Sequence, residues 1–349
     1  MTSDAYKSLH AIFARGLSDG LLAGAVLEAG SSTGEPVTLA LGTIAGAPDA
    51  PPMHADAIFD MASVTKVVAT TTACARCLDL GLLDFDAPAS DYLPSIAQLP
   101  GPPITLRDLA THVSGIDNAK VLSLPPSEAW DALVTRPPRW PVRSRFEYAC
   151  RNFILLGRIV EQVSGQRLDA FCGTQIFQPL GMKDTRFGPI LHPGPRVVAT
   201  CVAAGTISDE QARALQRPVG NAGLFSYAAD LARFCRAVLN DLRGDARLLY
   251  GPRSRPWMSQ PCSPKGLPAR AFGWDMRSRA EVPHRPTSFS RAAIGHSGWT
   301  GQSLWIDPEH DRYVIVLTNR TAVPGHASTH ARQMVLRGEL ADALLACLA

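Results

Sequence analysis

Residues 59–66 have the sequence FDMASVTK, in which Ser63 and Lys66 form a Ser-x-x-Lys tetrad. The apolar pattern over residues 67–80 predicts a helix, so the serine hydroxyl and the lysine amine lie one turn apart on the same helix face. A serine hydroxyl is a weak nucleophile until a neighbouring base takes its proton, and a partly desolvated lysine can do this. By itself, however, the tetrad more often marks an ordinary helix start with a solvated amine.

Two distant segments strengthen the chemical interpretation. Tyr148 lies in a loop ahead of a second predicted helix, for which we expect Asn152 as the N-cap and Gly165 as the stop. Near the C-terminus, residues 294–301 have the sequence IGHSGWTG and join two strand-like runs, with glycines where a backbone must come close to a bound group. An alcohol, an amine and a phenol from separate segments would therefore have to meet in one cleft.

The order and context of these elements resemble the serine β-lactamase and penicillin-binding-protein superfamily, where Ser-x-x-Lys, a tyrosine element and Lys-Thr-Gly recur in this order. Here His296, Ser297 and Gly298 stand in the place of Lys-Thr-Gly. The chain looks most like the branch that contains class C β-lactamases, DD-peptidases and β-lactamase-like carboxylesterases. Further stretches that support this resemblance lie at residues 81–86, 91–94, 104–115, 221–226 and 230–234.

The resemblance implies three catalytic roles. Ser63 would be the nucleophile, at a helix start whose free N–H groups favour negative charge on its oxygen. Lys66 would ease its deprotonation, either as a base or through its positive charge. Tyr148 would be the second proton-transfer group and would pass a proton to the leaving group. The ordinary alternatives are an N-cap serine, a salt-bridged lysine and a half-buried tyrosine.

The resemblance also implies a set of substrate-binding groups. The main-chain N–H groups of Ser63 and of Trp299, the residue after Gly298, would form the oxyanion hole. His296 would organise the tyrosine hydroxyl or bind a substrate carboxylate, in a weaker and pH-dependent version of the lysine role. Candidates for lining an apolar acyl pocket, with core packing as an equally good interpretation, are Phe225, Trp274 and Trp299.

Cys150 is a departure from the family pattern, because many relatives have asparagine two residues after the tyrosine. An amide donates and accepts hydrogen bonds to a substrate amide and to the lysine, whereas a thiol does either weakly. This substitution argues against efficient turnover of β-lactams or peptides. It also leaves open that Cys150 is itself reactive. Residues that match family positions but are expected to fix loops are Asp86, Asp91 and His112.

Composition limits the classes of partner. The chain has 349 residues, 46% of them hydrophobic, and 34 basic against 31 acidic residues give a net charge of +3. No charge run indicates a nucleic acid or an anionic membrane as partner, and no run is long enough to span a bilayer. The start of the chain shows no secretory signal, so we expect a cytoplasmic protein. In such a protein the eight cysteines are expected to be buried or free rather than joined in disulfides. The Cys74-x-x-Cys77 pair lacks further zinc ligands, so we expect neither a metal nor a cofactor.

The chain order predicts an α/β (α+β) fold of the β-lactamase/DD-peptidase type, an antiparallel sheet flanked by helices plus an all-α lobe. Residues 1–66 together with 271–349 would form the α/β lobe, and residues 67–270 the helical lobe, with the active site in the cleft between them. A helix at 3–18, strands near 23–29, 37–44, 288–295, 301–306 and 312–318, and a terminal helix at 326–348 are expected.

These features favour a serine hydrolase that cleaves carboxylic esters through an acyl-enzyme on Ser63. The alternative is the same acyl-enzyme acting on an amide or a β-lactam, as a DD-peptidase-like enzyme, or as an acyltransferase of specialised metabolism. A third hypothesis is a non-catalytic binding relative. The partner in each case is a small-molecule ester or amide, and neither its identity nor the oligomeric state can be read from the sequence.

Overall fold

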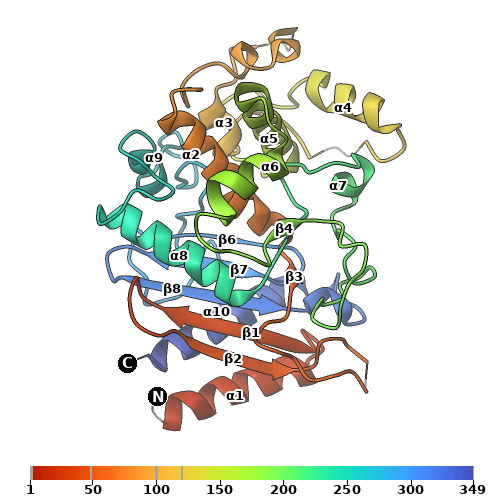
Figure 1. Cartoon of the computed structure of the whole chain (residues 1–349), viewed down its shortest axis with the longest axis vertical. Coiled ribbons are helices and arrows are strands. Elements are labelled where there is room, and N and C mark those ends of the chain that lie inside the picture. The colour runs from red at the N-terminus through yellow and green to blue at the C-terminus, as the bar shows by residue number, and fades with distance from the viewer. Residues whose placement is uncertain (1–2, 48, 99–100, 119–120, 349) are drawn as a thin grey trace.

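A five-stranded antiparallel sheet of order β2-β1-β8-β7-β6 forms one half of the molecule (Figure 1). The computed structural model describes residues 3–47, 49–98, 101–118 and 121–348. The sheet joins the two ends of the chain, since β1 pairs with β8 and places Leu27 opposite Val316. This architecture confirms the predicted fold class. The strands are β1 (Gly24–Gly30), β2 (Val37–Gly42), β6 (Ile294–Ser297), β7 (Ser303–Asp307) and β8 (Arg312–Thr318).

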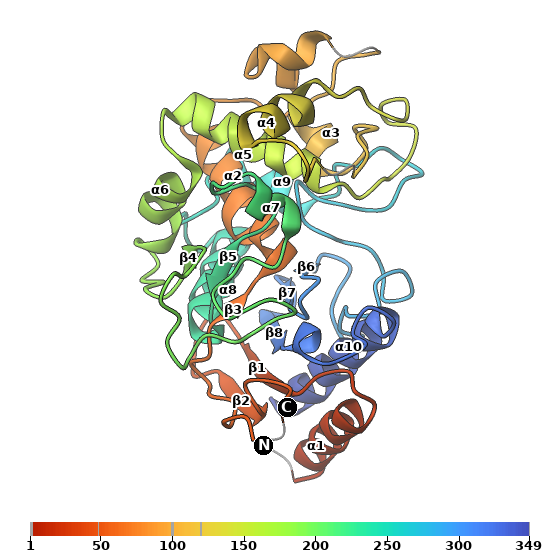
Figure 2. The same ribbon diagram turned by 90° about the vertical axis from the view of Figure 1, so that its right-hand side faces the viewer.

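Strand β8 is buried on both faces because its side chains alternate between two hydrophobic clusters. Val314 and Val316 pack in one cluster with α1 (Ser3–Ser18) and α10 (His330–Ala346). Ile315 and Leu317 belong to the larger cluster on the other face, which α8 covers. Figure 2 shows α1 and α10 on one side of the sheet and α8 (Ala228–Arg243) on the other.

The other half of the molecule is mainly helical, and its centre is α5 (Cys150–Ser164), which packs against α2, α3 and α6. A small antiparallel sheet of order β3-β5-β4 connects this half to the five-stranded sheet. The remaining strands and α-helices are β3 (Phe59–Asp60), α2 (Thr72–Asp79), α3 (Leu106–Ala110), α4 (Pro126–Thr135), α6 (Leu168–Cys172), β4 (Arg186–Phe187), α7 (Glu210–Ala214), β5 (Leu224–Ser226) and α9 (Arg255–Ser259). The 3-10 helices are η1 (Ala62–Val64), η3 (Ala89–Asp91), η4 (Pro94–Gln98) and η6 (Arg320–Ala322), and the π-helical segments are η2 (Lys66–Thr71) and η5 (Gly173–Phe177).

Several element boundaries differ from the sequence-based expectation. Helix α5 has Ala149 rather than Asn152 as its N-cap, while Gly165 ends it as expected in the left-handed conformation, with φ of 69°. Strand β6 covers only the end of the predicted strand at 288–295, because the residues before it form turns. Helix α10 begins four residues later than expected, at His330.

The division into two lobes at residues 66 and 270 stays a prediction. Helix α8 lies inside the range assigned to the helical lobe, yet it packs against β1, β7 and β8. Cys74 and Cys77 are both fully buried in the core. In the described ranges, no group of three or more His, Cys, Asp or Glu side chains could hold a metal ion. None of the helices in those ranges is both long and apolar enough to cross a bilayer.

Candidate active site

The Ser63 hydroxyl is presented by a single 3-10 turn, η1, that follows β3 directly. Ala62 has a positive φ of 43°, a conformation that residues other than glycine rarely adopt. The buried Asp60 carboxylate compensates by accepting the Ala62 N–H at 2.7 Å and, from another loop, the Ser208 N–H at 2.7 Å. Asp60 therefore stabilises the helical turn η1, which directs Ser63 toward the cavity described below.

Lys66 begins the next helical segment, η2, and is completely buried. Its Nζ donates to Ser63 Oγ at 2.8 Å, to the Asn221 carbonyl at 2.9 Å and to Cys150 Sγ at 3.5 Å. An ammonium group has three N–H donors, which these three acceptors can take up, and Tyr148 is a further side-chain hydrogen-bond partner of Lys66. Burial lowers the pKa of Lys66, but nearby Cys150 and Tyr148 raise it, and the net direction is upward. Lys66 is therefore a buried cation that holds the serine oxygen, rather than an amine with a free lone pair.

Tyr148 lies just before α5, with its ring between two imidazoles. The ring centroids of His112 and His296 are 4.5 Å and 6.2 Å from that of Tyr148. Lys66 Nζ is 5.1 Å from the centroid of the Tyr148 ring. The structure thus brings the hydroxyl, the amine and the phenol named from the sequence into one place, although they come from η1, η2 and the loop before α5.

His112 holds the start of α5 as a neutral ring. Its Nδ1 accepts the Ala149 N–H and an Asn152 Nδ2–H, both at 3.2 Å, so we place its proton on Nε2. Burial, Arg270 and Lys66 together keep the pKa of His112 well below its usual value. Asn152, predicted as an N-cap, instead uses its side chain to orient His112 and to accept a hydrogen bond from Ser114 Oγ at 2.8 Å.

His296 is also buried and neutral. Its Nδ1–H donates to the Ser297 carbonyl at 3.0 Å, which leaves Nε2 as an acceptor. Burial, followed by the positive charges of Arg270 and Lys66, lowers the pKa of His296 to about 3. At neutral pH His296 therefore carries no positive charge. It lines a second cavity of ≈ 300 Å³ on the sheet side of Tyr148 rather than the cavity at Ser63.

Trp299 lies at the end of β6, directly against the serine turn. A Cβ on Gly298 would lie 2.6 Å from the Met61 carbonyl oxygen, so only glycine allows this approach. Within the part of the chain that the structure describes, the Trp299 N–H donates to no main-chain acceptor. Two arginines hold the loop: Arg320 donates to the Trp299 carbonyl at 2.6 Å, and Arg337 donates to the Gly298 carbonyl at 3.3 Å. Trp299 lines the same cavity as Ser63, so the assignment of its N–H to the oxyanion hole stays a prediction.

One cavity of ≈ 490 Å³ contains the serine hydroxyl, and Tyr148, Cys150 and the half-exposed Trp299 line it with Ser63. Phe225 is absent from this lining, because it is 1% exposed and packs in a hydrophobic cluster with Ile58 and Ile207. Trp274 is likewise buried in the core. Residues that line the cavity but carry no readable motif are Asn118, Cys201, Val202, Ser208, Asp209, Glu210, Gln211 and Arg213.

Two residues contribute to the site in ways that a search of the sequence for catalytic side chains does not find. Asn221 belongs to a stretch that matched the family, but it takes part through its main-chain carbonyl. Asn118 caps α5 by accepting the Cys150 N–H with Oδ1 at 2.8 Å. Its amide therefore stands beside Cys150, at the edge of the cavity where the family amide is missing.

Residues 12–339 match the Beta-lactamase family. The chain belongs to this family. Among curated relatives, the N-acetylmuramyl-L-alanine amidase of Bacillus subtilis (strain 168) is 28% identical over 78% of this chain and 70% of its own length. The putative D-alanyl-D-alanine carboxypeptidase of Escherichia coli (strain K12) is 28% identical over 76% of this chain and 70% of its own.

Solved structures with the same fold include unliganded simvastatin synthase (LovD) from Aspergillus terreus, with a TM-score of 0.77 and 19% identity over 99% of both chains. EstCE1, described as a hydrolase with promiscuous acyltransferase activity, has a TM-score of 0.74 and 21% identity, covering 96% of this chain and 98% of its own. At such identities these two show the fold alone. Family membership and the site together indicate a serine hydrolase or transferase of the beta-lactamase family.

Proposed function

We propose that this protein is a cofactor-independent serine hydrolase that cleaves small carboxylic esters through an acyl-enzyme on Ser63. The observation that carries the proposal is the 2.8 Å contact between Lys66 Nζ and Ser63 Oγ, at the wall of a cavity that Tyr148 also lines. A buried ammonium beside a hydroxyl favours the alkoxide, because the charge of the alkoxide is then compensated in a medium of low dielectric constant.

The proposed reaction uses the phenol as the proton carrier, since the three N–H groups of Lys66 already have acceptors. Ionised Tyr148 takes the Ser63 proton as Oγ forms a bond to the ester carbonyl carbon. The N–H groups of Ser63 and Trp299 stabilise the resulting oxyanion. Tyr148 then gives this proton to the departing alkoxide. In the second half, a water molecule loses a proton to Tyr148 as its oxygen bonds to the acyl carbon, and Tyr148 returns that proton to Ser63 Oγ as the bond from Oγ to the acyl carbon breaks and the acid leaves.

Esters are preferred over amides because of the residues next to Ser63. Cys150 supplies only a thiol where an amide would bind a substrate amide, and its sulfur is occupied by Lys66 at 3.5 Å. An amine leaving group needs a well-placed proton donor and a held amide, whereas an alkoxide leaves with less assistance. An amide or β-lactam substrate would therefore acylate Ser63 slowly.

Acyl transfer is the second candidate, because Tyr148 borders two cavities, of ≈ 490 Å³ and ≈ 300 Å³. An alcohol in the second cavity would meet the same phenol that handles the Ser63 proton. The test is partition of a p-nitrophenyl acyl group between water and an added alcohol. If only the free acid forms, and no ester of the added alcohol at any alcohol concentration, acyl transfer is excluded.

The test of the main proposal is hydrolysis of short p-nitrophenyl esters by the wild type and by Ser63→Ala. Ser31→Ala, on the turn between β1 and β2, is the matched control and should remain fully active. We expect the Ser63 variant to lose activity and to lose labelling by a fluorophosphonate probe. Unchanged hydrolysis would remove the proposal, and an unlabelled wild-type Ser63 would support a non-catalytic relative.

A further inference from the structure

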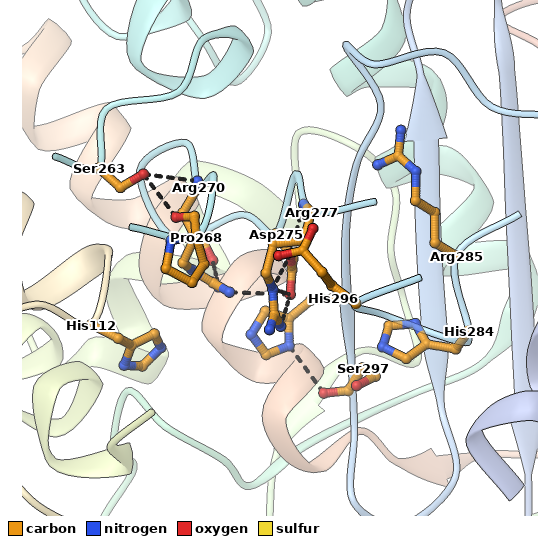
Figure 3. Close-up of polar contacts among 12 residues, drawn as sticks. His112, Ser263, Pro268, Arg270, Asp275, Arg277, His284, Arg285, His296 and Ser297 are labelled. Atoms are coloured by element: carbon orange, nitrogen blue, oxygen red, sulfur yellow. Dashed lines mark hydrogen bonds and ion pairs between the residues drawn. The ribbon is translucent and has the colours of Figure 1, made fainter. Parts of the chain in front are cut away.

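An ion triad lies in the loop between α9 and β6. Figure 3 shows Asp275 between Arg270 and Arg277, next to the ring of His296. Arg270 is 1% exposed and donates to Asp275 Oδ2 at 3.2 Å and to the Gly273 carbonyl at 3.0 Å. Arg277 donates to Asp275 Oδ1 at 3.0 Å. Two guanidinium groups share one carboxylate, so the triad keeps a net positive charge.

The triad is docked onto the strand that carries His296. The Asp275 N–H donates to the Gly295 carbonyl at 2.9 Å, and the Gly295 N–H donates back to Asp275 at 3.0 Å. On the other side, the Arg270 guanidinium carbon lies 5.7 Å from the ring centroid of Phe146, two residues before Tyr148. Arg270 therefore spans from β6 to the segment that presents the phenol.

Arg270, Tyr148 and His296 line the same ≈ 300 Å³ cavity. The two imidazoles that flank Tyr148 respond to this guanidinium in the same way. After burial, Arg270 is the leading cause that lowers the pKa of His112 and the pKa of His296, ahead of Lys66 in both. The histidines are thereby kept neutral, and neither can compensate a phenolate.

We propose that Arg270 is a positioning residue that supplies, from the second cavity that Tyr148 lines, a positive charge in addition to that of Lys66, and so favours the phenolate form of Tyr148. The proposal rests on the proposed function, because Arg270 acts only through Tyr148. The phenol loses its proton to solvent before substrate arrives, and Arg270 and Lys66 compensate the charge that remains.

The other charged or titratable groups around Tyr148 do not provide this charge. Lys66 approaches from η2, where its Nζ also donates to Ser63 Oγ at 2.8 Å. Asp275 is negative and offsets part of the charge of Arg270. Arg277 donates its hydrogen bonds to Asp275, and its side chain is 23% exposed, so solvent screens its charge. The remaining titratable groups that line the two cavities of Tyr148 are Cys150, Cys201, Asp209, Glu210, Arg213, Glu281, His284, His296 and His330.

The experiment is the pH dependence of kcat/KM for p-nitrophenyl acetate with the full chain, since the acid limb of this profile reports the ionisation of the free enzyme. In Arg270→Met the limb should move up by about one pH unit, which is about a tenfold loss of kcat/KM below the limb. Arg270→Lys should restore most of the shift. His296→Gln should leave the pH of the limb in place, since His296 carries no charge there.

Arg285→Met is the matched structural control. Arg285 is also buried, at 5% exposure, and donates to the Ala293 carbonyl at 3.1 Å, but it lines neither cavity of Tyr148. Should Arg270→Met fail to fold, Asp275→Asn gives the opposite sign: loss of the offsetting carboxylate should move the limb down. Structural damage alone has no reason to produce shifts of opposite sign in the two variants.

A limb that stays in place in Arg270→Met, or moves in His296→Gln, overturns the proposal while the esterase proposal stands. Should the wild type show no Ser63-dependent activity, the proposed function fails and Arg270 is tested without turnover. Tyrosinate absorbance is then titrated in the wild type and in Tyr148→Phe, with and without Arg270→Met. A Tyr148 titration that is the same in both Arg270 backgrounds overturns the inference.

Discussion

Replacing Lys66 by methionine tests the central electrostatic claim about the site. Unit charges 2.8 Å apart attract by roughly 6 kcal/mol at an effective dielectric constant of about 20. About 2 kcal/mol is already present as the charge-assisted hydrogen bond to the neutral Ser63 hydroxyl. The remainder, about 4 kcal/mol, is specific to the transition state and corresponds to a roughly thousandfold loss of kcat/KM.

The assay is hydrolysis of p-nitrophenyl acetate under conditions where product formation is linear in enzyme. Lys265→Met, which removes an exposed lysine, is the control for loss of one positive charge. Thermal unfolding of both variants shows whether the Lys66 variant is folded. A folded Lys66→Met protein whose kcat/KM remains within tenfold of the wild type refutes the assignment of Lys66 as the compensating cation.

Three further perturbations follow from the geometry. Cys150→Asn places an amide beside Ser63, and one added hydrogen bond of about 1 kcal/mol should make acylation by a penicillin about fivefold faster. The rate is measured by mass spectrometry of the adduct, and an unchanged rate contradicts the role given to the thiol. Gly298→Ala places a methyl group 2.6 Å from the Met61 carbonyl and should lower kcat about a hundredfold, whereas Gly194→Ala, with nothing within 4 Å of the added carbon, should not. His296→Gln should make the free energy of unfolding fall less steeply as the pH is lowered. The unfolded chain protonates His296 below its ordinary pKa of 6.5, while the folded protein binds that proton only near a pKa of about 3. In urea unfolding between pH 6 and 4, the slope of the unfolding free energy against pH should be smaller by about 1.4 kcal/mol per pH unit in the variant, and an equal slope in both proteins would show that His296 is not neutral in the fold.

Local periodicity was sufficient for the elements that flank the site. The helix at 3–18 and the strand at 312–318 were predicted with the bounds that the structure has, because each one buries a regular face. The start of α5 was not, since Asn152 has the side chain of a good cap but is drawn into hydrogen bonds with Ser114 and His112. Tertiary contacts override a local preference wherever a buried polar group needs the same side chain.

The grouping of charges was also beyond the sequence. Arg270 and Asp275 lie in a loop without periodic pattern, and the backbone pairing of Asp275 with Gly295 brings them to β6. Phe225 shows the same difficulty in reverse. The sequence left the acyl pocket and core packing as equally good interpretations, and the position of Phe225 on β5 puts the ring in the core with Ile58 and Ile207.

The histidines connect these observations. His112 and His296 flank the phenol and would each carry part of a positive charge at mildly acidic pH if they stood alone. Burial and the charge of Arg270 suppress this charge in both, so the positive potential at Tyr148 comes from Lys66 and Arg270. The proposal therefore assigns the acid limb to the phenol and not to a histidine. The pH of the acid limb should therefore respond to the number of cations around the ring and stay in place when the neutral His296 is replaced by glutamine.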